Sequence, residues 1–160
     1  MSTAMTADAV NNDNARYGAS KEFLTITIAD QLFGIPVLQV QDVLGEQSVT
    51  KVPLSPPAIS GSLNLRGRIV TAINVRRCLG LSDREGKHQV MSVVVEQGGE
   101  LYSLIIDEVG DVLNLRDDDY ENNPATLDST WKNVALGIYK MQGRIMVVLD
   151  VPKLIESIQT

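Results

Sequence analysis

The sequence QLFGIPVLQVQDVLG occupies residues 31–45, and residues 100–114 carry ELYSLIIDEVGDVLN at an offset of 69 positions. Identical residues occur at five pairs of positions: Leu32 and Leu101, Val40 and Val109, Asp42 and Asp111, Val43 and Val112, and Leu44 and Leu113. An ordered repeat of this kind indicates two similar β units, each a hairpin followed by a V-x-D-V-L segment. We therefore expect two small β-barrels packed side by side. The alternative is that hairpins of similar composition resemble one another by chance.

Alternation of apolar and polar residues predicts strands around the repeat. Leu24, Ile26 and Ile28 are separated by threonines, a period of two that places the aliphatic side chains on one face of a strand. Three hairpins are predicted in this way, at residues 22–37, 90–106 and 135–151, with turns at 30–31, 98–99 and 142–143. Two further strands are predicted at residues 49–52 and 69–75.

Prolines mark the starts of two predicted helices. Pro57 begins a short helix that ends at Gly67, and Pro152 begins a terminal helix. Their apolar faces consist of Ile59, Leu63 and Leu65 in the first helix and of Leu154, Ile155 and Ile158 in the second. Residues 1–20 contain few large apolar side chains and are predicted to be a flexible tail, and residues 82–89 to be a polar loop.

Composition excludes several classes of protein. The 160 residues are 44% hydrophobic and 21% charged, as in one compact soluble domain. The net charge of -6 disfavours binding to nucleic acid or anionic lipid. A single cysteine forms no intramolecular disulfide, and residues 1–20 lack the pattern of a secretion signal. No apolar stretch approaches the roughly 18 residues that span a bilayer. We therefore expect a cytoplasmic protein that meets a membrane only through another protein.

Catalytic and metal-binding groups are scarce. His88, the one histidine, lies in a polar loop and is expected to be exposed and passive. Cys78 follows two arginines, but its apolar neighbours favour a small, inert, buried side chain. The acidic run 117–121 lacks the glycine and glutamate of a calcium-binding loop, and no phosphate-binding glycine motif occurs. We expect no enzymatic activity, no cofactor and no metal. A small β-barrel hydrolase or metal enzyme is the alternative of a different class.

Charge is distributed unevenly along the chain. Residues 48–87 hold seven basic and two acidic side chains, a balance of +5, whereas residues 96–128 hold ten acidic side chains and one arginine, a balance of -9. This asymmetry favours a protein that presents different surfaces to different partners. The alternative is that both runs are ordinary solvated faces.

Residues 61–70, with the sequence GSLNLRGRIV, closely resemble the G-x-x-N-L-R-G-x-I-[VL] signature of the CheW family of bacterial chemotaxis coupling proteins. Further segments resemble family landmarks in the same order, at residues 22–24, 33–35, 40–43, 106–109 and 137–139. The resemblance implies a mainly β fold of two five-stranded SH3-like barrels packed side by side, with short helices that include a C-terminal one. Such a domain would span residues 21–158, with exchange of strands between the barrels left open.

The resemblance also implies a function. It points to a non-enzymatic adaptor that couples methyl-accepting chemoreceptors to a CheA-type histidine kinase, so that receptor state controls kinase activity. The implied partners are the cytoplasmic tip of the receptor and the P5 regulatory domain of the kinase. The adaptor would be recruited from the cytoplasm to membrane-associated receptor arrays. An adaptor of a parallel chemosensory pathway, such as surface motility or development, is the alternative.

Receptor-binding residues are carried over from the family signature. Arg66 is the leading receptor contact, and Asn64 and Gly67 are expected to shape its turn. The positions that match the groove between the barrels are Val40, Asp42 and Val109. The aspartate is expected to be exposed, while the valines could equally be core residues. The resemblance assigns no kinase-binding residue in this chain.

Two residues depart from the family pattern. Thr71 stands where the family often has proline, and Arg68 adds a second charge beside the signature. Both changes are expected to alter receptor preference.

Overall fold

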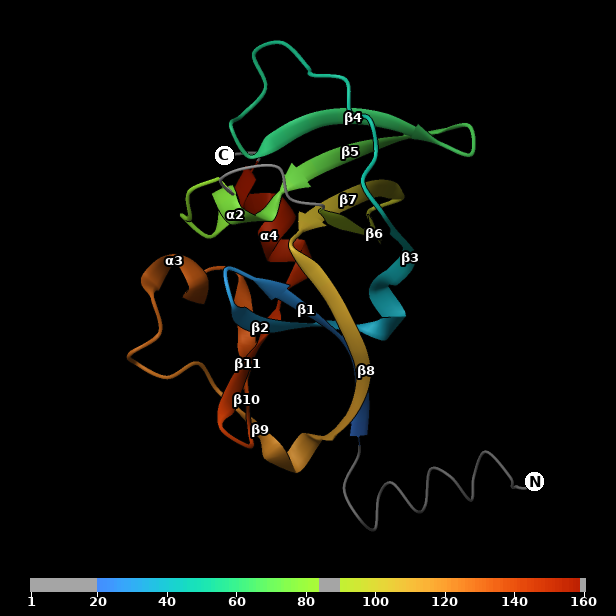
Figure 1. Ribbon diagram of the computed structural model, residues 1–160. Coiled ribbons are helices and arrows are strands. Elements are labelled where there is room, and N and C mark those ends of the chain that lie inside the picture. The colour runs from blue at the N-terminus through green and yellow to red at the C-terminus, as the bar shows by residue number, and fades with distance from the viewer. Residues whose placement is uncertain (1–19, 84–89, 159–160) are drawn as a thin grey trace, which may run out of the picture.

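A computed structural model describes residues 20–83 and 90–158, which form two sheets of six and five strands (Figure 1). The first sheet contains, in spatial order, β8 (Glu108–Arg116), β1 (Ser20–Ile28), β2 (Gln31–Pro36), β11 (Arg144–Leu149), β10 (Ala135–Met141) and β9 (Tyr120–Glu121). The second contains β3 (Val40–Leu44), β6 (Met91–Gln97), β7 (Glu100–Ile106), β5 (Arg68–Asn74) and β4 (Ile59–Leu65). This architecture confirms the predicted fold of two SH3-like barrels, with the two-residue β9 as an additional strand of the first.

Short helices lie between the strands and after the last one. The α-helices are α2 (Val75–Cys78), α3 (Ser129–Lys132) and α4 (Val151–Ile158), and the 3-10 helices are η1 (Val37–Gln39) and η2 (Asp117–Asp119). In Figure 1, α4 lies between the upper barrel, which contains β4 to β7, and the lower barrel, which contains β1 and β2. Pro152 is the second residue of α4, and the three apolar residues predicted to face inward from this helix are buried.

Each barrel is assembled from both halves of the chain. After β2 the chain leaves the first sheet, and β3 pairs with β6 in the second. After β7 it crosses back, and β8 pairs with β1 in the first. Equivalent strands follow the same order in the two sheets, and each sheet contains one parallel pair, β2 with β11 and β7 with β5. The repeated sequences therefore occupy equivalent places, each comprising a strand, a crossing and a second strand.

The strands are buried on two faces because alternate side chains point in opposite directions. The largest hydrophobic cluster includes Ile26, Leu104 and Leu154, and so joins both sheets and α4. A smaller cluster belongs to the first sheet: Phe23, Leu32, Tyr139, Met146 and Val148. Another belongs to the second: Leu63, Val70, Ala72, Val94 and Leu101. The shared core between the sheets is thus larger than the core of either barrel.

All three predicted hairpins are confirmed, as β1–β2, β6–β7 and β10–β11. The strand predicted at residues 69–75 is confirmed as β5. Ser20 belongs to β1 and not to the predicted tail. The rest of that tail, and most of the predicted polar loop with His88, lie outside the described residues.

The helix predicted after Pro57 is wrong, because the segment forms strand β4. Ile59 and Leu63 are four residues apart, a spacing that fits a helix and a strand equally well. Burial instead alternates, with Gly61 and Leu63 buried and the residue between them half-buried. Pairing with β5 settled the conformation.

The strand predicted at residues 49–52 is also wrong, because only a single bridge forms there, between Thr50 and Ser62. Gly61 allows this loop to lie against β4. A β-carbon on Gly61 would collide with the backbone carbonyl of Thr50. The loop is therefore held by close backbone approach and not by a regular ladder.

Candidate functional site

The signature sequence forms the tight turn between β4 and β5. Leu65 pairs with Arg68, which leaves Arg66 and Gly67 as a two-residue loop with φ of 52° and 84°. Two successive positive φ values define a type I′ turn, for which Asn-Gly is the preferred sequence. The Gly67 N–H donates to Asn64 Oδ1 over 2.9 Å, so both residues shape the turn. An arginine in the left-handed region costs about 1 kcal/mol of backbone strain. Its position in the turn places the guanidinium at the tip of the hairpin.

An ion pair links this arginine, at one edge of the second sheet, to an aspartate at the other edge. Arg66 Nη2 lies 3.0 Å from Asp42 Oδ2, and the two side chains are 76% and 26% exposed. Asp42 lies on β3, and the turn follows β4, so the pair bridges the two edge strands of the sheet. The aspartate is more buried than predicted, and its Oδ1 also accepts from the Val43 N–H over 2.8 Å.

The arrangement suits recognition of a helical or acidic partner. A guanidinium carries five N–H donors, so a contact with one carboxylate leaves donors for a second carboxylate or for helix-end carbonyls. Ile69 pairs with Asn64 beside the turn and is 71% exposed. A directed polar group and an exposed aliphatic group therefore occur on one hairpin, as recognition of an amphipathic helix requires.

The two valines predicted as groove residues lie on the two crossing strands, Val40 on β3 and Val109 on β8. Both are half-buried and pack against the core between the sheets. Val40 pairs with Val95 on β6, and Val109 pairs with Ile26 on β1. They occupy equivalent places at the start of the two crossing strands. The structure therefore brings Arg66 together with Asn64, Gly67 and Asp42, while Val109 belongs to the other sheet.

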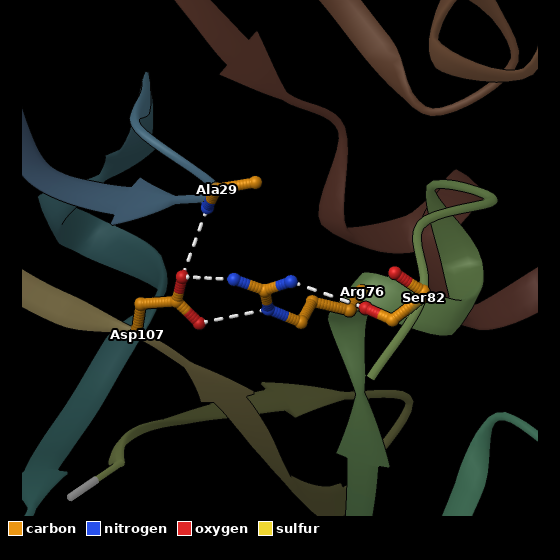
Figure 2. A network of polar contacts seen from close by, with 4 residues as sticks. All are labelled: Ala29, Arg76, Ser82 and Asp107. Atoms are coloured by element: carbon orange, nitrogen blue, oxygen red, sulfur yellow. Dashed lines mark hydrogen bonds and ion pairs between the residues drawn. The ribbon is translucent and has the colours of Figure 1, made fainter. Parts of the chain in front are cut away.

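Sequence reasoning missed a buried polar network between the barrels, which Figure 2 shows. Arg76 Nε and Nη2 donate to Asp107 Oδ1 and Oδ2 over 3.0 and 2.6 Å. The Ala29 N–H donates to Oδ2 over 2.9 Å, and Arg76 Nη1 donates to the Ser82 carbonyl over 3.1 Å. The hydrogen bond with Asp107 raises the pKa of Arg76. The available signal was an acidic residue placed directly after the mostly apolar run LYSLII.

Other polar features offer little chemistry. Burial raises the pKa of the Cys78 thiol to about 11, so the reactive thiolate is scarce at neutral pH. The acidic run forms η2 and β9. Within residues 20–83 and 90–158, no three His, Cys, Asp or Glu side chains gather closely enough to hold a metal ion. In the same ranges, every helix is too short or too polar to cross a bilayer.

Comparison with known proteins gives one consistent result. A family model described as the CheW-like domain matches residues 22–159. The chemotaxis protein CheW of Thermotoga maritima is 30% identical over 142 residues, which cover 88% of this chain and 92% of the relative. That of Klebsiella aerogenes is 28% identical over 137 residues, covering 86% and 82%. The crystal structure of the scaffolding protein TtCheW from Thermoanaerobacter tengcongensis superposes with a TM-score of 0.73 at 27% identity, covering 81% of this chain and 88% of that one.

Proposed function

The chain belongs to the CheW family of chemotaxis scaffold proteins, and from that premise we propose that it couples methyl-accepting chemoreceptors to a CheA-type histidine kinase. In this role the protein catalyses nothing itself. It binds the P5 regulatory domain of the kinase and the cytoplasmic tip of the receptor, so that receptor state controls kinase activity. The receptor would recruit it from the cytoplasm to the membrane-associated array.

One observation carries the receptor-binding part of the proposal. Arg66 occupies a left-handed conformation that glycine or asparagine would adopt at lower cost, yet its side chain is 76% exposed. An ion pair with Asp42 restricts where the guanidinium points. Recognition of a partner requires an exposed cation with a fixed orientation. The stability of the turn does not require one, and the arginine adds backbone strain there.

We propose that the helical tip of the receptor binds to this hairpin. The guanidinium would donate to a carboxylate or to helix-end carbonyls, and Ile69 would contact the apolar stripe of the helix. Binding of the kinase is assigned to a separate surface, because the family signature and the charge asymmetry of the chain both favour two partner surfaces.

The test is a pull-down with each partner separately, using wild type and Arg66→Glu. The matched control is Arg144→Glu. Arg144 is an exposed arginine that directly follows the Gln142–Gly143 turn, which joins β10 to β11 as the Arg66 turn joins β4 to β5. Loss of a directed charge contact costs about 2 kcal/mol or more, so we expect receptor binding by Arg66→Glu to fall at least about thirtyfold. Binding of the kinase should not change, and Arg144→Glu should bind both partners.

Two outcomes would contradict the proposal. Loss of both partners by Arg66→Glu, with an altered circular dichroism spectrum, would give the arginine a structural role. Failure of the wild type to bind either partner would remove the coupling function itself.

A further inference from the structure

The carboxylate of Asp107 accepts hydrogen bonds from residues of both barrels (Figure 2). Asp107 is the single residue between β7 of the second sheet and β8 of the first, and its N–H donates to the Thr27 carbonyl of β1 over 3.2 Å. Ala29, in the β1–β2 turn, also belongs to the first barrel. Arg76 lies on α2, directly after β5 of the second barrel. The ion pair therefore joins the two barrels.

The geometry of this contact restricts rotation as well as separation. Two parallel N–H···O bonds link Arg76 to Asp107, and a third donor, the Ala29 N–H, reaches the same carboxylate. The remaining guanidinium bond, to the Ser82 carbonyl, holds the arginine from its other side. Bidentate pairs have a fixed orientation. With side-chain exposures of 16% and 9%, this pair is also poorly screened by solvent.

The strand order alone does not call for this contact, because the equivalent crossing at η1 is made without it. The residue 69 positions before Asp107 is Leu38, on η1, whose side chain is 96% exposed. An offset of 76 positions brings the starts of α2 and α4 together and matches Arg76 with Pro152. A proline ring and a leucine cannot form an ion pair. The two crossings thus share a strand order but differ in how they are held.

The pair also connects the two regions that carry the candidate receptor residues. Strand β5 begins beside the Arg66 turn and ends just before Arg76. Strand β8 begins just after Asp107. Its second residue, Val109, pairs with Ile26 of β1. The contact therefore joins the far end of the signature hairpin to the start of the strand that enters the other barrel.

We propose that Arg76 and Asp107 are positioning residues that hold the two barrels at one angle, so that a displacement produced by a partner on one barrel is transmitted to the other. The consequence for signalling rests on the proposed coupling function, whereas the fixed angle does not. Without the pair, each partner still binds, but receptor state loses its control over the kinase.

The first measurement is the distance between the barrels, by pulsed electron paramagnetic resonance. Spin labels replace the exposed residues Glu96 on β6 and Lys140 on β10, in a Cys78→Ser background. Asp107→Asn removes the charge and keeps the size, while Arg76→Lys keeps the charge and loses the fork geometry. We expect both variants to lose the single narrow distance distribution of the parent chain.

The matched control lies on the same helix. Arg77, next to Arg76, donates from Nε and Nη2 to Asp83 over 3.2 and 2.8 Å, but this pair is exposed and local. Asp83→Asn therefore removes the same chemistry without removing a contact between barrels. We expect it to keep the narrow distance distribution.

The second measurement is kinase activity with the full-length variants, the kinase and a receptor fragment. We expect Asp107→Asn to bind each partner as the wild type does and to lose the receptor-dependent change in autophosphorylation. An unchanged distance distribution in folded Asp107→Asn and Arg76→Lys would overturn the fixed angle. A broadened distribution with intact receptor control would overturn the link to signalling. If the wild type bound neither partner, the coupling function would fail, and the distance measurement would still decide the positioning role.

Discussion

The chain passes between the sheets twice, and the two passages differ. At Val37–Gln39 it passes through a 3-10 turn with an exposed leucine, whereas at Asp107 one residue makes the passage and its carboxylate is buried in a polar network. The turns between β4 and β5 and between β10 and β11 differ in a similar way, since arginine occupies the first and glutamine the second. The two passages therefore share a place in the strand order and differ in the side chains that hold them.

The largest loss of stability is expected when Asp107, in the second passage, is replaced by the leucine found at the equivalent position of the first. Asp107→Leu leaves the Arg76 guanidinium in a largely buried place without its carboxylate, which costs about 3–5 kcal/mol in the free energy of unfolding. Denaturation with urea measures this loss. The reciprocal change, Leu38→Asp, adds a charge at an exposed position and should stay within about 0.5 kcal/mol of wild type. Equal losses in the two variants would show that the passages are energetically alike.

A smaller loss is expected where the second barrel meets its covering loop. Gly61→Ala places a β-carbon against the Thr50 carbonyl at a φ of 150°, so the loop must move away from β4. We expect a loss of about 2 kcal/mol in unfolding free energy and faster amide exchange at Thr50 and Ser62, which bond to each other. Gly143→Ala, in open space at the β10–β11 turn, is the control and should leave exchange at these two amides unchanged.

The signature turn should gain stability when it loses its arginine. Arg66→Asn restores the Asn-Gly sequence that a type I′ turn prefers and relieves about 1 kcal/mol of left-handed strain. The arginine of the lost ion pair is 76% exposed and Asp42 is 26% exposed, so solvent screens the pair in part and its loss offsets part of this gain. We expect a higher unfolding midpoint together with weaker receptor binding. A variant that is less stable and binds the receptor normally would show that Arg66 stabilises the turn and does not contact the receptor.

The smallest effect concerns Cys78, which matches Leu154 at the offset that relates α2 to α4. Burial disfavours the thiolate and raises the pKa to about 11, so the reactive form appears only as pH rises toward that value. At pH 8 the thiolate fraction should be about two hundredfold below that of an ordinary thiol. The rate of alkylation by iodoacetamide against pH measures this. A rate that reaches its plateau below pH 9 would contradict the apolar role shared with Leu154.

The fold was predictable wherever a local pattern determines it. Alternating aliphatic residues specify the three hairpins, because a period of two admits one conformation over several residues. The segment after Pro57 was ambiguous, since its apolar spacing fits a helix and a strand. The partners of β3 and β8 were not predictable, because a strand's own sequence does not say which edge it joins.

The candidate site was predictable only in part, for the same reason. The Asn64–Gly67 contact spans three residues and belongs to a recognisable turn. The pairing of Arg66 with Asp42 depends on how the two edges of a sheet approach each other, and Arg76 meets Asp107 across 31 residues of sequence. Contacts of this kind arise from tertiary structure, so the residue types suggest them but the spacing does not.

The reciprocal placement of β3 and β8 makes the two barrels an interlocked pair. A break in the chain between Asp83 and Val90 would leave each fragment with strands of both sheets and the whole of neither. Each fragment would be left with unpaired strand edges and only part of the shared core, so neither could complete a barrel alone. Expressed as separate polypeptides, the fragments could complete the fold only by joining each other, as the subunits of a strand-swapped heterodimer do.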